Sequence, residues 1–388
     1  MPKQIYIIDD QPDQLELMDL LLRELNKEWR VHPFSSPHQL MEAVQQAPPH
    51  LVLADDMMPE MRGSELLDRV RQVSPQTVRV LISGYIVKAG RLSAAHQYVA
   101  KPLRGEEILQ RLECALEAQE ALEDSNLGCI VSRLQSFPVV PTAAAKLLKI
   151  LDDNQADLSS VAELLNQDAG IFTKLMQMAN SPMFGTGEVK DSQEALLKLG
   201  TASVRGMVLS LHIFQSYEKI TFPPWPVRRI WSHCLNTANL AQNAARLGGL
   251  PPMDCTHAHF AGLVHELGRL ILIDNRPDDY LRVCQNAAGE EIALTEAERN
   301  YFGTTHMDLA AFMLRLWGVP SIVSEAVQFQ ESPWQSSRRD VFTPVTALYI
   351  ADCAAQDGGF VHAPVDLDYL KALDAENIAR QITGSALK

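Results

Sequence analysis

Carboxyl side chains that directly follow apolar runs are the residues of this sequence best placed for chemistry. Asp9 and Asp10 follow the run Ile5–Ile8, and Asp55 follows the run Leu51–Ala54. Short continuous apolar runs are typical of strands that are buried on both faces of a parallel sheet. In such a sheet, ligands bind beyond the carboxyl ends of the strands. We therefore expect Asp55 to take part in chemistry, although a solvated acid in a turn is the plainer interpretation.

The first third of the chain alternates strand-like runs with helical stretches, which predicts a doubly wound parallel α/β sheet. The strand-like runs are Ile5–Ile8, Val31–Phe34, Leu51–Ala54, Val78–Ile82 and Tyr98–Ala100. Polar residues at four strand ends should meet at one edge of this sheet: Asp9 and Asp10, Asp55, Ser83, and Lys101. Oxygen ligands from Asp10, Asp55 and a main-chain carbonyl suit Mg²⁺. The ion and the Lys101 ammonium would offset the repulsion among the three carboxylates.

These motifs resemble those of response-regulator receiver domains, and the resemblance covers residues 1–120. The residues that carry it are Asp9-Asp10, the run Asp55–Pro59 with Gly63 after it, Leu81–Gly84, and Tyr98–Pro102. Taken singly, the motifs around Ser83 and Lys101 would more often be a plain turn and a plain loop. Their agreement in type and order favours the receiver interpretation.

The resemblance implies a flavodoxin-like fold and a role for each of these residues. Asp55 would accept a phosphoryl group from a sensor histidine kinase or a phosphotransfer protein in a bacterial two-component phosphorelay. Asp9 and Asp10 would organise Mg²⁺ together with Asp55. Ser83 would contact the phosphoryl group and Lys101 would pair with it. Tyr98 would be an aromatic switch, although a half-buried strand aromatic is its plainer interpretation.

The residues after the expected sheet predict a connecting helix within the range 105–131. The stretch Glu106–Leu127 is rich in Ala and Leu and contains neither Gly nor Pro, which favours one long helix. We expect its first half to dock on the sheet and its second half to project toward Gly128. A short coiled coil with a partner helix is the alternative, because apolar residues recur along it at intervals of four and three.

The remaining sequence predicts an all-α domain over residues 132–355, followed by a C-terminal extension over residues 356–388. Helical periodicity recurs without convincing strands, and the stretch Met253–Leu272 is predicted as one helix. His233, His265, Glu266 and Asp352 lie on separate predicted helices, apart from the adjacent pair His265-Glu266. Histidines and carboxylates that converge from several helices build metal sites in helical bundles. Core or helix-capping histidines that make hydrogen bonds are the plainer interpretation.

This second region resembles the HDOD domain, a divergent relative of the HD metal-dependent phosphohydrolases. The motifs that carry the resemblance are Phe137–Pro141, Leu197–Gly200, Trp231–His233, Phe260–Gly268 and Leu316–Pro320. The sequence departs from a working HD hydrolase in three places: it has His265-Glu266 instead of His-Asp, Arg269 instead of a lysine, and Gln328–Gln330 where related cyclic-dinucleotide phosphodiesterases have paired histidines.

These departures determine what we expect of the second domain. His233, His265, Glu266 and Asp352 could hold one metal ion, but too few ligands remain for a second. We therefore expect a non-catalytic output domain that binds an unidentified protein or small ligand under control of the receiver. The alternative is a receiver-controlled metal-dependent phosphohydrolase or cyclic-dinucleotide phosphodiesterase. A further alternative is an adaptor in which phosphorylation only drives formation of a homodimer.

Composition restricts the remaining function classes. A chain of 388 residues with 46% hydrophobic residues has room for about two domains with their own cores. A net charge of −14 without a basic run disfavours nucleic-acid binding. No apolar stretch is long enough to cross a membrane and no signal peptide is evident, so we expect a cytoplasmic protein. The six cysteines lack Cys-x-x-Cys spacing and are expected to be small core residues.

Overall fold

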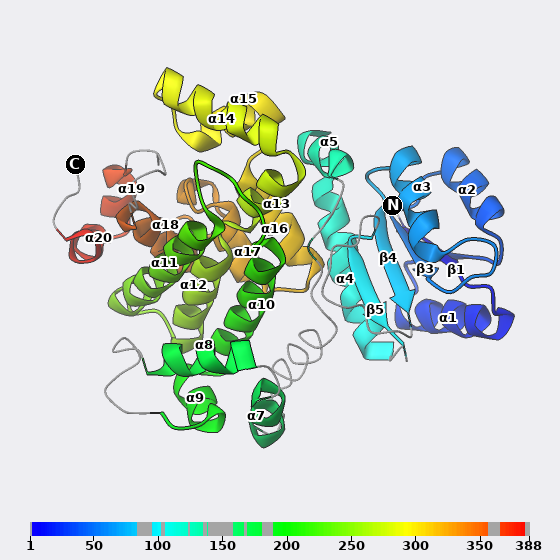
Figure 1. Cartoon of the computed structure of the whole chain (residues 1–388), viewed down its shortest axis with the longest axis horizontal. Helices are drawn as coiled ribbons and strands as arrows, with labels where there is room; N and C mark the ends of the chain where they lie inside the picture. Colours follow the sequence, from blue (N-terminus) through cyan, green and yellow to red (C-terminus); the bar gives the residue numbers. More distant parts are fainter. Residues whose placement is uncertain are drawn as a thin grey trace. The chain divides into compact units, whose positions relative to one another are not determined.

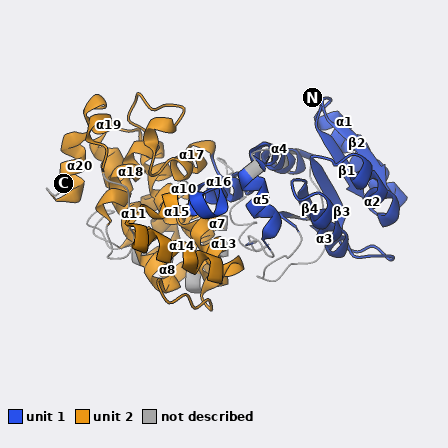
Figure 2. Cartoon of the chain, turned by 90° about the horizontal axis from the view of Figure 1, so that it is seen from above, with its two compact units in different colours: residues 1–139, 298–320 blue, residues 140–297, 321–388 orange. Residues whose placement is uncertain are grey.

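The computed structural model describes residues 2–83, 95–101, 105–122, 125–134, 138, 158–166, 169–180, 189–355 and 365–384. The chain forms two compact units (Figure 2). The first consists of Met1–Val139 with Glu298–Pro320, and the second consists of Val140–Ala297 with Ser321–Lys388. Among the helices described, none combines the length and the apolar character needed to cross a membrane.

The first unit is built on a five-stranded parallel sheet with the strand order β2-β1-β3-β4-β5. Its strands are β1 (Gln4–Ile8), β2 (Arg30–Phe34), β3 (Leu51–Asp55), β4 (Val78–Ser83) and β5 (Gln97–Ala100). In the register, Ile8 pairs with Ala54, and Ser83 pairs with Ala100. The predicted doubly wound sheet is therefore confirmed, and the carboxyl ends of β1, β3, β4 and β5 lie at one edge.

Four helices cover the two faces of this sheet (Figure 1). They are α1 (Pro12–Leu25), α2 (Pro37–Gln46), α3 (Gly63–Val73) and α4 (Gly105–Leu122). Helices α1 and α4 contact each other on one face, and α2 and α3 contact each other on the other. Tyr6 and Ile8 join the core beneath α2 and α3, while the intervening Ile7 is also fully buried. Burial on both faces explains why the strand sequences are continuously apolar.

The prediction of one long helix over Glu106–Leu127 is wrong. Helix α4 ends at Leu122, and a separate helix α5 runs from Ser125 to Arg133. Gly128 lies inside α5, where a Cβ atom would be only 2.6 Å from the Leu122 carbonyl oxygen. The chain thus turns back so closely that only glycine fits. Helix propensity alone did not reveal this turn, because propensity reports local preference and not tertiary contact.

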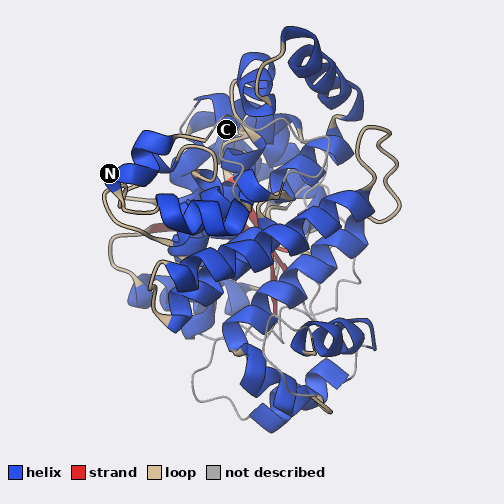
Figure 3. Cartoon of the chain, turned by 90° about the vertical axis from the view of Figure 1, so that its left-hand side faces the viewer, coloured by secondary structure: helices blue, strands red, loops and turns tan. Residues whose placement is uncertain are grey.

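The described part of the second unit contains helices and no strand, as expected for an all-α domain (Figure 3). Its central helices α11 (Val227–Leu247), α12 (Pro252–Val264) and α18 (Pro344–Ala354) pack against one another. Around them lie α7 (Leu158–Asn166), α8 (Ala169–Ala179), α9 (Ser192–Leu199), α10 (Thr201–Tyr217), α13 (Leu267–Asn275), α14 (Pro277–Glu290), α17 (Ser321–Gln328), the short 3₁₀ turn η2 (Pro333–Gln335), α19 (Leu367–Ala372) and α20 (Glu376–Thr383). Helix α15 (Leu294–Phe302) crosses from this unit to the first, and α16 (His306–Leu316) belongs to the first unit.

The predicted single helix Met253–Leu272 is also wrong, because the chain breaks between α12 and α13. His265 is the residue after α12, and Glu266 precedes α13 with φ −92° and ψ 6°. A Cβ atom at Gly262 would lie 2.4 Å from the Ala238 Cα atom of α11. This close approach of two backbones fixes the end of α12 against α11. The break places both His265 and Glu266 at a junction between helices.

Candidate functional site

Three carboxyl groups meet at the carboxyl edge of the sheet. Asp9 and Asp10 follow β1, and Asp55 ends β3, so the pairing of these parallel strands brings them together. One oxygen from each lies within 4.8 Å of the other two. Asp9 and Asp55 are buried and Asp10 is half-buried. The cluster expected from the sequence is therefore present.

Backbone amides orient two of these carboxyl groups. The Gln11 N–H donates to Asp9 Oδ1 at 2.9 Å, and the Met57 N–H donates to Asp55 Oδ2 at 2.8 Å. The buried Oδ1 atom of Asp10 has no hydrogen-bonding partner among the described residues. Burying an oxygen without a partner is costly, and a hard cation would remove that cost. The donor set is all oxygen, so these residues fit Mg²⁺.

Lys101 provides the positive charge of the pocket. Its Nζ lies 2.5 Å from Asp55 Oδ1 and 3.3 Å from Asp9 Oδ2, and it also donates to Gln14 Oε1 at 2.7 Å. Burial by itself lowers the pKa of Lys101, but hydrogen bonds and charge interactions with Asp55 and Asp9 outweigh it and raise that pKa above its ordinary value. Lys101 is therefore an ammonium group at neutral pH. The sequence did not single out Gln14, although its place in the first turn of α1 puts it at the same edge.

Ser83 and Lys101 occupy neighbouring strand ends. Ser83 is buried at the end of β4, and its carbonyl oxygen accepts a hydrogen bond from the Lys101 N–H at 3.0 Å. This bond continues the pairing of β4 with β5, so the two residues are positioned together. The side chain of Tyr98, predicted to be an aromatic switch, lies outside the described residues.

Gly63 and Asp56 lie where the chain passes from Asp55 into α3. A Cβ atom at Gly63 would lie 2.1 Å from the Asp55 carbonyl oxygen, so no other residue fits this start of α3. Asp56 Oδ1 accepts a hydrogen bond from the Ser64 N–H at 3.4 Å. Asp56 therefore turns toward α3, as expected for its neighbouring position on the strand end. Of the two adjacent carboxyl groups, Asp55 and Asp56, it is Asp55 that contacts Lys101.

A second cluster lies buried in the all-α unit, where His233, His265, Glu266 and Asp352 converge. His233 Nε2 is 3.1 Å from His265 Nε2. Asp352 Oδ1 is 3.3 Å from His233 Nε2 and 3.5 Å from His265 Nε2. Glu266 Oε1 is 3.5 Å from His265 Nε2. The four candidate ligands predicted from the sequence are thus brought together by α11, the α12–α13 junction and α18.

The four distances given above, 3.1–3.5 Å, are close to those between ligands of a single zinc ion. Ligand atoms that lie about 2.0–2.1 Å from a zinc ion at the corners of a tetrahedron are roughly 3.3 Å apart. His265 Nδ1 lies 2.8 Å from the Gly262 carbonyl oxygen. A proton on Nδ1 donates to this oxygen and leaves Nε2 facing the cluster. Histidines that bind a metal ion through one ring nitrogen usually donate the other ring N–H to an oxygen in this way.

The same cluster also suits a proton instead of a metal ion. Burial by itself lowers the pKa of His265, but the neighbouring Cys234, Asp352 and Glu266 outweigh it and raise that pKa well above its ordinary value. A protonated His265 beside two carboxylates would satisfy the buried charges by hydrogen bonding.

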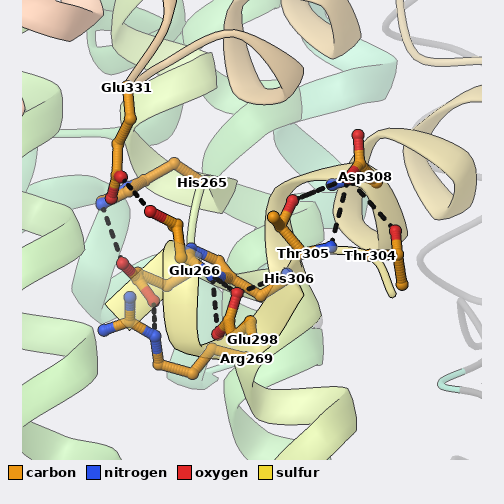
Figure 4. A network of polar contacts seen from close by, with 10 residues as sticks. His265, Glu266, Arg269, Glu298, Thr304, Thr305, His306, Asp308 and Glu331 are labelled. Carbon is orange, nitrogen blue, oxygen red and sulfur yellow. Dashed lines mark hydrogen bonds and ion pairs between the residues drawn. The ribbon is translucent and has the colours of Figure 1, made fainter. Parts of the chain in front are cut away.

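Glu266 connects this cluster to a buried arginine (Figure 4). Glu266 Oε2 lies 2.7 Å from Arg269 Nε, and both side chains are almost fully buried. The Arg269 guanidinium also lies 5.2 Å from the centre of the Trp225 ring. Arg269 therefore holds the carboxylate of Glu266 in place. The pairing with Trp225 was not expected from the sequence, because 44 residues separate the two positions.

Another buried pair joins α15 to α16 within the first unit. His306 Nδ1 lies 2.8 Å from Glu298 Oε2, and both side chains are fully buried. Figure 4 also shows Thr305 with Asp308, which form a capping box at the start of α16. These contacts fix the angle at which the chain enters α16. Nothing in the sequence pointed to the pairing of His306 with Glu298.

The parallel sheet and its acidic pocket place the first unit in the receiver class. Residues 5–113 match the family model of the response regulator receiver domain, and residues 137–333 match that of the HDOD domain. The chain belongs to the HDOD family and carries a receiver domain ahead of its HDOD domain. Both resemblances noted in the sequence are confirmed.

Curated and solved relatives agree with this assignment. The chain is 31% identical over 120 residues to the hydrogenase transcriptional regulatory protein HoxA of Cupriavidus necator, covering 30% of this chain and 24% of HoxA. It is 20% identical over 207 residues to an uncharacterized protein of Treponema pallidum, covering 52% of this chain and 39% of that protein. The chain therefore spans well under half the length of these curated relatives. An HDOD domain protein of unknown function from Geobacter sulfurreducens shares the fold, with a TM-score of 0.55 at 22% identity, covering 69% of this chain and 89% of that one.

Proposed function

We propose that the receiver accepts a phosphoryl group on Asp55 from a sensor histidine kinase or a phosphotransfer protein. The observation that carries this proposal is the position of Asp55 Oδ1, 2.5 Å from Lys101 Nζ and beside Asp9 and Asp10. An Asp55 oxygen attacks the phosphorus of the donor's phosphohistidine. A phosphorus–oxygen bond forms, the phosphorus–nitrogen bond breaks, and its electron pair returns to the imidazole.

The residues around Asp55 have separate tasks in this transfer. The Met57 N–H holds Oδ2 of Asp55 and so presents Oδ1 toward Lys101. The Lys101 ammonium pairs with the phosphoryl oxygens, and the Ser83 hydroxyl donates to one of them. Asp9, Asp10 and Asp55 would hold Mg²⁺, which when bound neutralises charge on the oxygens of the phosphoryl group.

The HDOD domain, in this proposal, acts by binding a protein or a small ligand. The small number of possible metal ligands supports this proposal. Within the described residues, this unit has one group of side chains that could bind a metal ion, made of His233, His265 and Glu266, with Asp352 beside them. By the family resemblance, the paired histidines of related phosphodiesterases would fall around Gln328–Gln330, where this chain has no histidine. A hydrolytic two-metal site needs ligands on both ions, and glutamine is a poor substitute for histidine.

A second candidate is a metal-dependent phosphohydrolase. The HDOD domain belongs to the HD phosphohydrolase superfamily. The close spacing of His233, His265 and Glu266, with Asp352 beside the two histidines, favours a site for one ion, and one ion can activate water. The two candidates make opposite predictions about turnover.

The phosphoacceptor function predicts magnesium-dependent labelling of the protein. Radiolabelled acetyl phosphate with Mg²⁺ should transfer close to one phosphoryl group to each chain. Excess chelator should suppress this labelling strongly, because the three carboxyl groups would then lack the ion that offsets their charge. Equal labelling with and without chelator would contradict the proposal. Treatment with hydroxylamine, which cleaves acyl phosphates, provides the control for a carboxyl attachment.

Metal content and turnover separate binding from hydrolysis. We expect the purified full chain to hold at most one transition-metal ion and to hydrolyse neither cyclic dinucleotides nor nucleotides after loading with zinc, manganese or iron. The assay should include the phosphorylated form, because the receiver controls the output. Metal-dependent turnover that disappears in His265→Ala without a change in melting temperature would establish the phosphohydrolase instead.

A further inference from the structure

Gln14 lies outside the acidic cluster and accepts a hydrogen bond from Lys101. The Lys101 ammonium has three N–H donors. Its Nζ lies 2.5 Å from Asp55 Oδ1, 2.7 Å from Gln14 Oε1 and 3.3 Å from Asp9 Oδ2. Of these three acceptors, Gln14 is the uncharged one, and its contact is shorter than that of Asp9. Gln14 is therefore a substantial part of what holds the ammonium in the pocket.

Helix α1 brings Gln14 to the pocket. Gln11 is the N-cap of α1, so Gln14 is the third residue inside the helix. Met18 and Leu22 follow Gln14 at intervals of four, and both are buried. Residues spaced by four lie on one face of a helix, so Gln14 stands at the pocket end of the buried face of α1. The packing of α1 against β1, β2 and α4 therefore fixes the position of Gln14.

The orientation of the Gln14 amide follows from its two neighbours. Its Nε2 donates to Gln11 Oε1 at 2.6 Å. Lysine offers only donors, so the amide oxygen of Gln14 has to face Lys101 and the amide nitrogen has to face Gln11. The Gln11 N–H in turn donates to Asp9 Oδ1 at 2.9 Å, and Lys101 Nζ donates to Asp9 Oδ2 at 3.3 Å. Asp9, Gln11, Gln14 and Lys101 thus form a closed ring of hydrogen bonds.

This ring takes the place of an ordinary capping arrangement at the start of α1. A glutamine at the third helical position often reaches back to the backbone N–H of the N-cap residue. In α1 that N–H, from Gln11, donates to Asp9 Oδ1 instead, and the Gln11 side chain makes no capping bond. The Gln14 oxygen is therefore available to Lys101. Gln14 contributes to the pocket and not to the end of the helix.

An uncharged acceptor suits a pocket that has to receive an anion. Asp9, Asp10 and Asp55 already place one oxygen each within 4.8 Å of one another. A fourth carboxylate would bind the ammonium more tightly and would repel an incoming phosphoryl group. The Gln14 amide oxygen holds Lys101 without adding negative charge. It can keep the ammonium in place while Asp55 ceases to be its partner.

We propose that Gln14 is a positioning residue for phosphoryl transfer and that it acts through Lys101. This inference rests on the proposed phosphorylation of Asp55. Before transfer, Lys101 donates to Asp55 Oδ1, the oxygen presented for attack. As the phosphoryl group arrives, this N–H passes to a phosphoryl oxygen, while Gln14 and Asp9 keep the other two. The ammonium is thus already oriented when charge develops, which lowers the barrier of the transfer.

Gln14→Met in the full chain tests the effect on the transfer. Methionine keeps the length of the side chain and favours a helix, but it provides only a weak acceptor. The initial rate of labelling by acetyl phosphate with Mg²⁺ should fall about ten-fold, a usual effect of losing one hydrogen bond to a charged group. The matched control is Gln45→Met, at an exposed glutamine of α2, which should label at the wild-type rate. Wild-type labelling of Gln14→Met, or an equal loss in the control, overturns the inference.

A double-mutant cycle shows whether Gln14 acts through Lys101. In a chain that carries Lys101→Met, adding Gln14→Met should change the initial labelling rate by less than about two-fold, because no ammonium is left to position. A structural role of Gln14 in α1 would instead give the same ten-fold loss in both backgrounds. Such additive behaviour overturns the inference.

The ammonium signal of Lys101 provides a readout that does not need phosphorylation. Lysine labelled with ¹⁵N makes ammonium protons that exchange slowly with water visible by NMR, and Lys101→Arg assigns the signal. Exchange should be at least about five-fold faster in Gln14→Met, since one of the three hydrogen bonds that protect these protons is lost. Equal exchange in both proteins, or a wild-type signal already lost to exchange, overturns the inference. A wild type that acetyl phosphate does not label overturns the proposed role of Asp55, whereas a labelled wild type with an insensitive Gln14→Met overturns only the role of Gln14.

Discussion

Asp55→Asn is expected to lower phosphorylation of the protein by roughly a thousand-fold or more, because it removes the attacking oxygen of a covalent step. The amide is close in size to the carboxyl group and sits beside the same Lys101, so the fold should be retained. Incorporation of label from acetyl phosphate with Mg²⁺ measures the effect. Unchanged circular dichroism and an unchanged melting profile of the variant would show that the loss is chemical.

Asp56→Asn is the matched control for this experiment. Asp56 is the next residue, but it receives the Ser64 N–H at the start of α3 and is turned away from Lys101. Labelling of this variant should stay within about two-fold of the wild type, since the attacking group is intact. Full labelling of Asp55→Asn together with loss of label in Asp56→Asn would move the phosphoacceptor to Asp56.

Glu266→Ala is expected to destabilise the all-α unit by about 3–5 kcal/mol, the usual cost of breaking a buried ion pair by removing one partner. The substitution removes the carboxylate that lies 2.7 Å from Arg269 Nε and faces His265. For a unit of this size, such a loss corresponds to a fall in melting temperature of roughly 6–20 °C. Differential scanning calorimetry of the full chain measures it as a shift of one of its unfolding transitions.

Two further variants serve as controls for the effect of Glu266→Ala on stability. Glu290→Ala changes an exposed glutamate at the end of α14 and should leave the melting temperature within about 2 °C of the wild type. Glu266→Gln keeps the size of the side chain and isolates the loss of charge. If Glu266→Ala melts at the wild-type temperature, the cluster does not stabilise this unit, and a role in metal chemistry becomes the better explanation for its residues.

The sequence by itself determined the receiver fold and the composition of its pocket. Asp9, Asp55 and Lys101 could be predicted together because apolar runs of a parallel sheet end at a common edge, so position in the chain implies position in space. The same holds for the candidate ligands His233 and His265, which lie in family motifs, and for Asp352, which was predicted from its place on a separate helix. These inferences needed no knowledge of packing.

Only the tertiary structure decided where the helices break and where α16 binds. The break at His265-Glu266 depends on the fit of Gly262 against Ala238, and the turn after Leu122 depends on the fit of Gly128 against a carbonyl oxygen. The bond from Gln97 to Leu316 joins residues 219 positions apart. Propensity and periodicity describe interactions within a few turns of the chain, whereas these features arise from close contact between distant backbones and side chains.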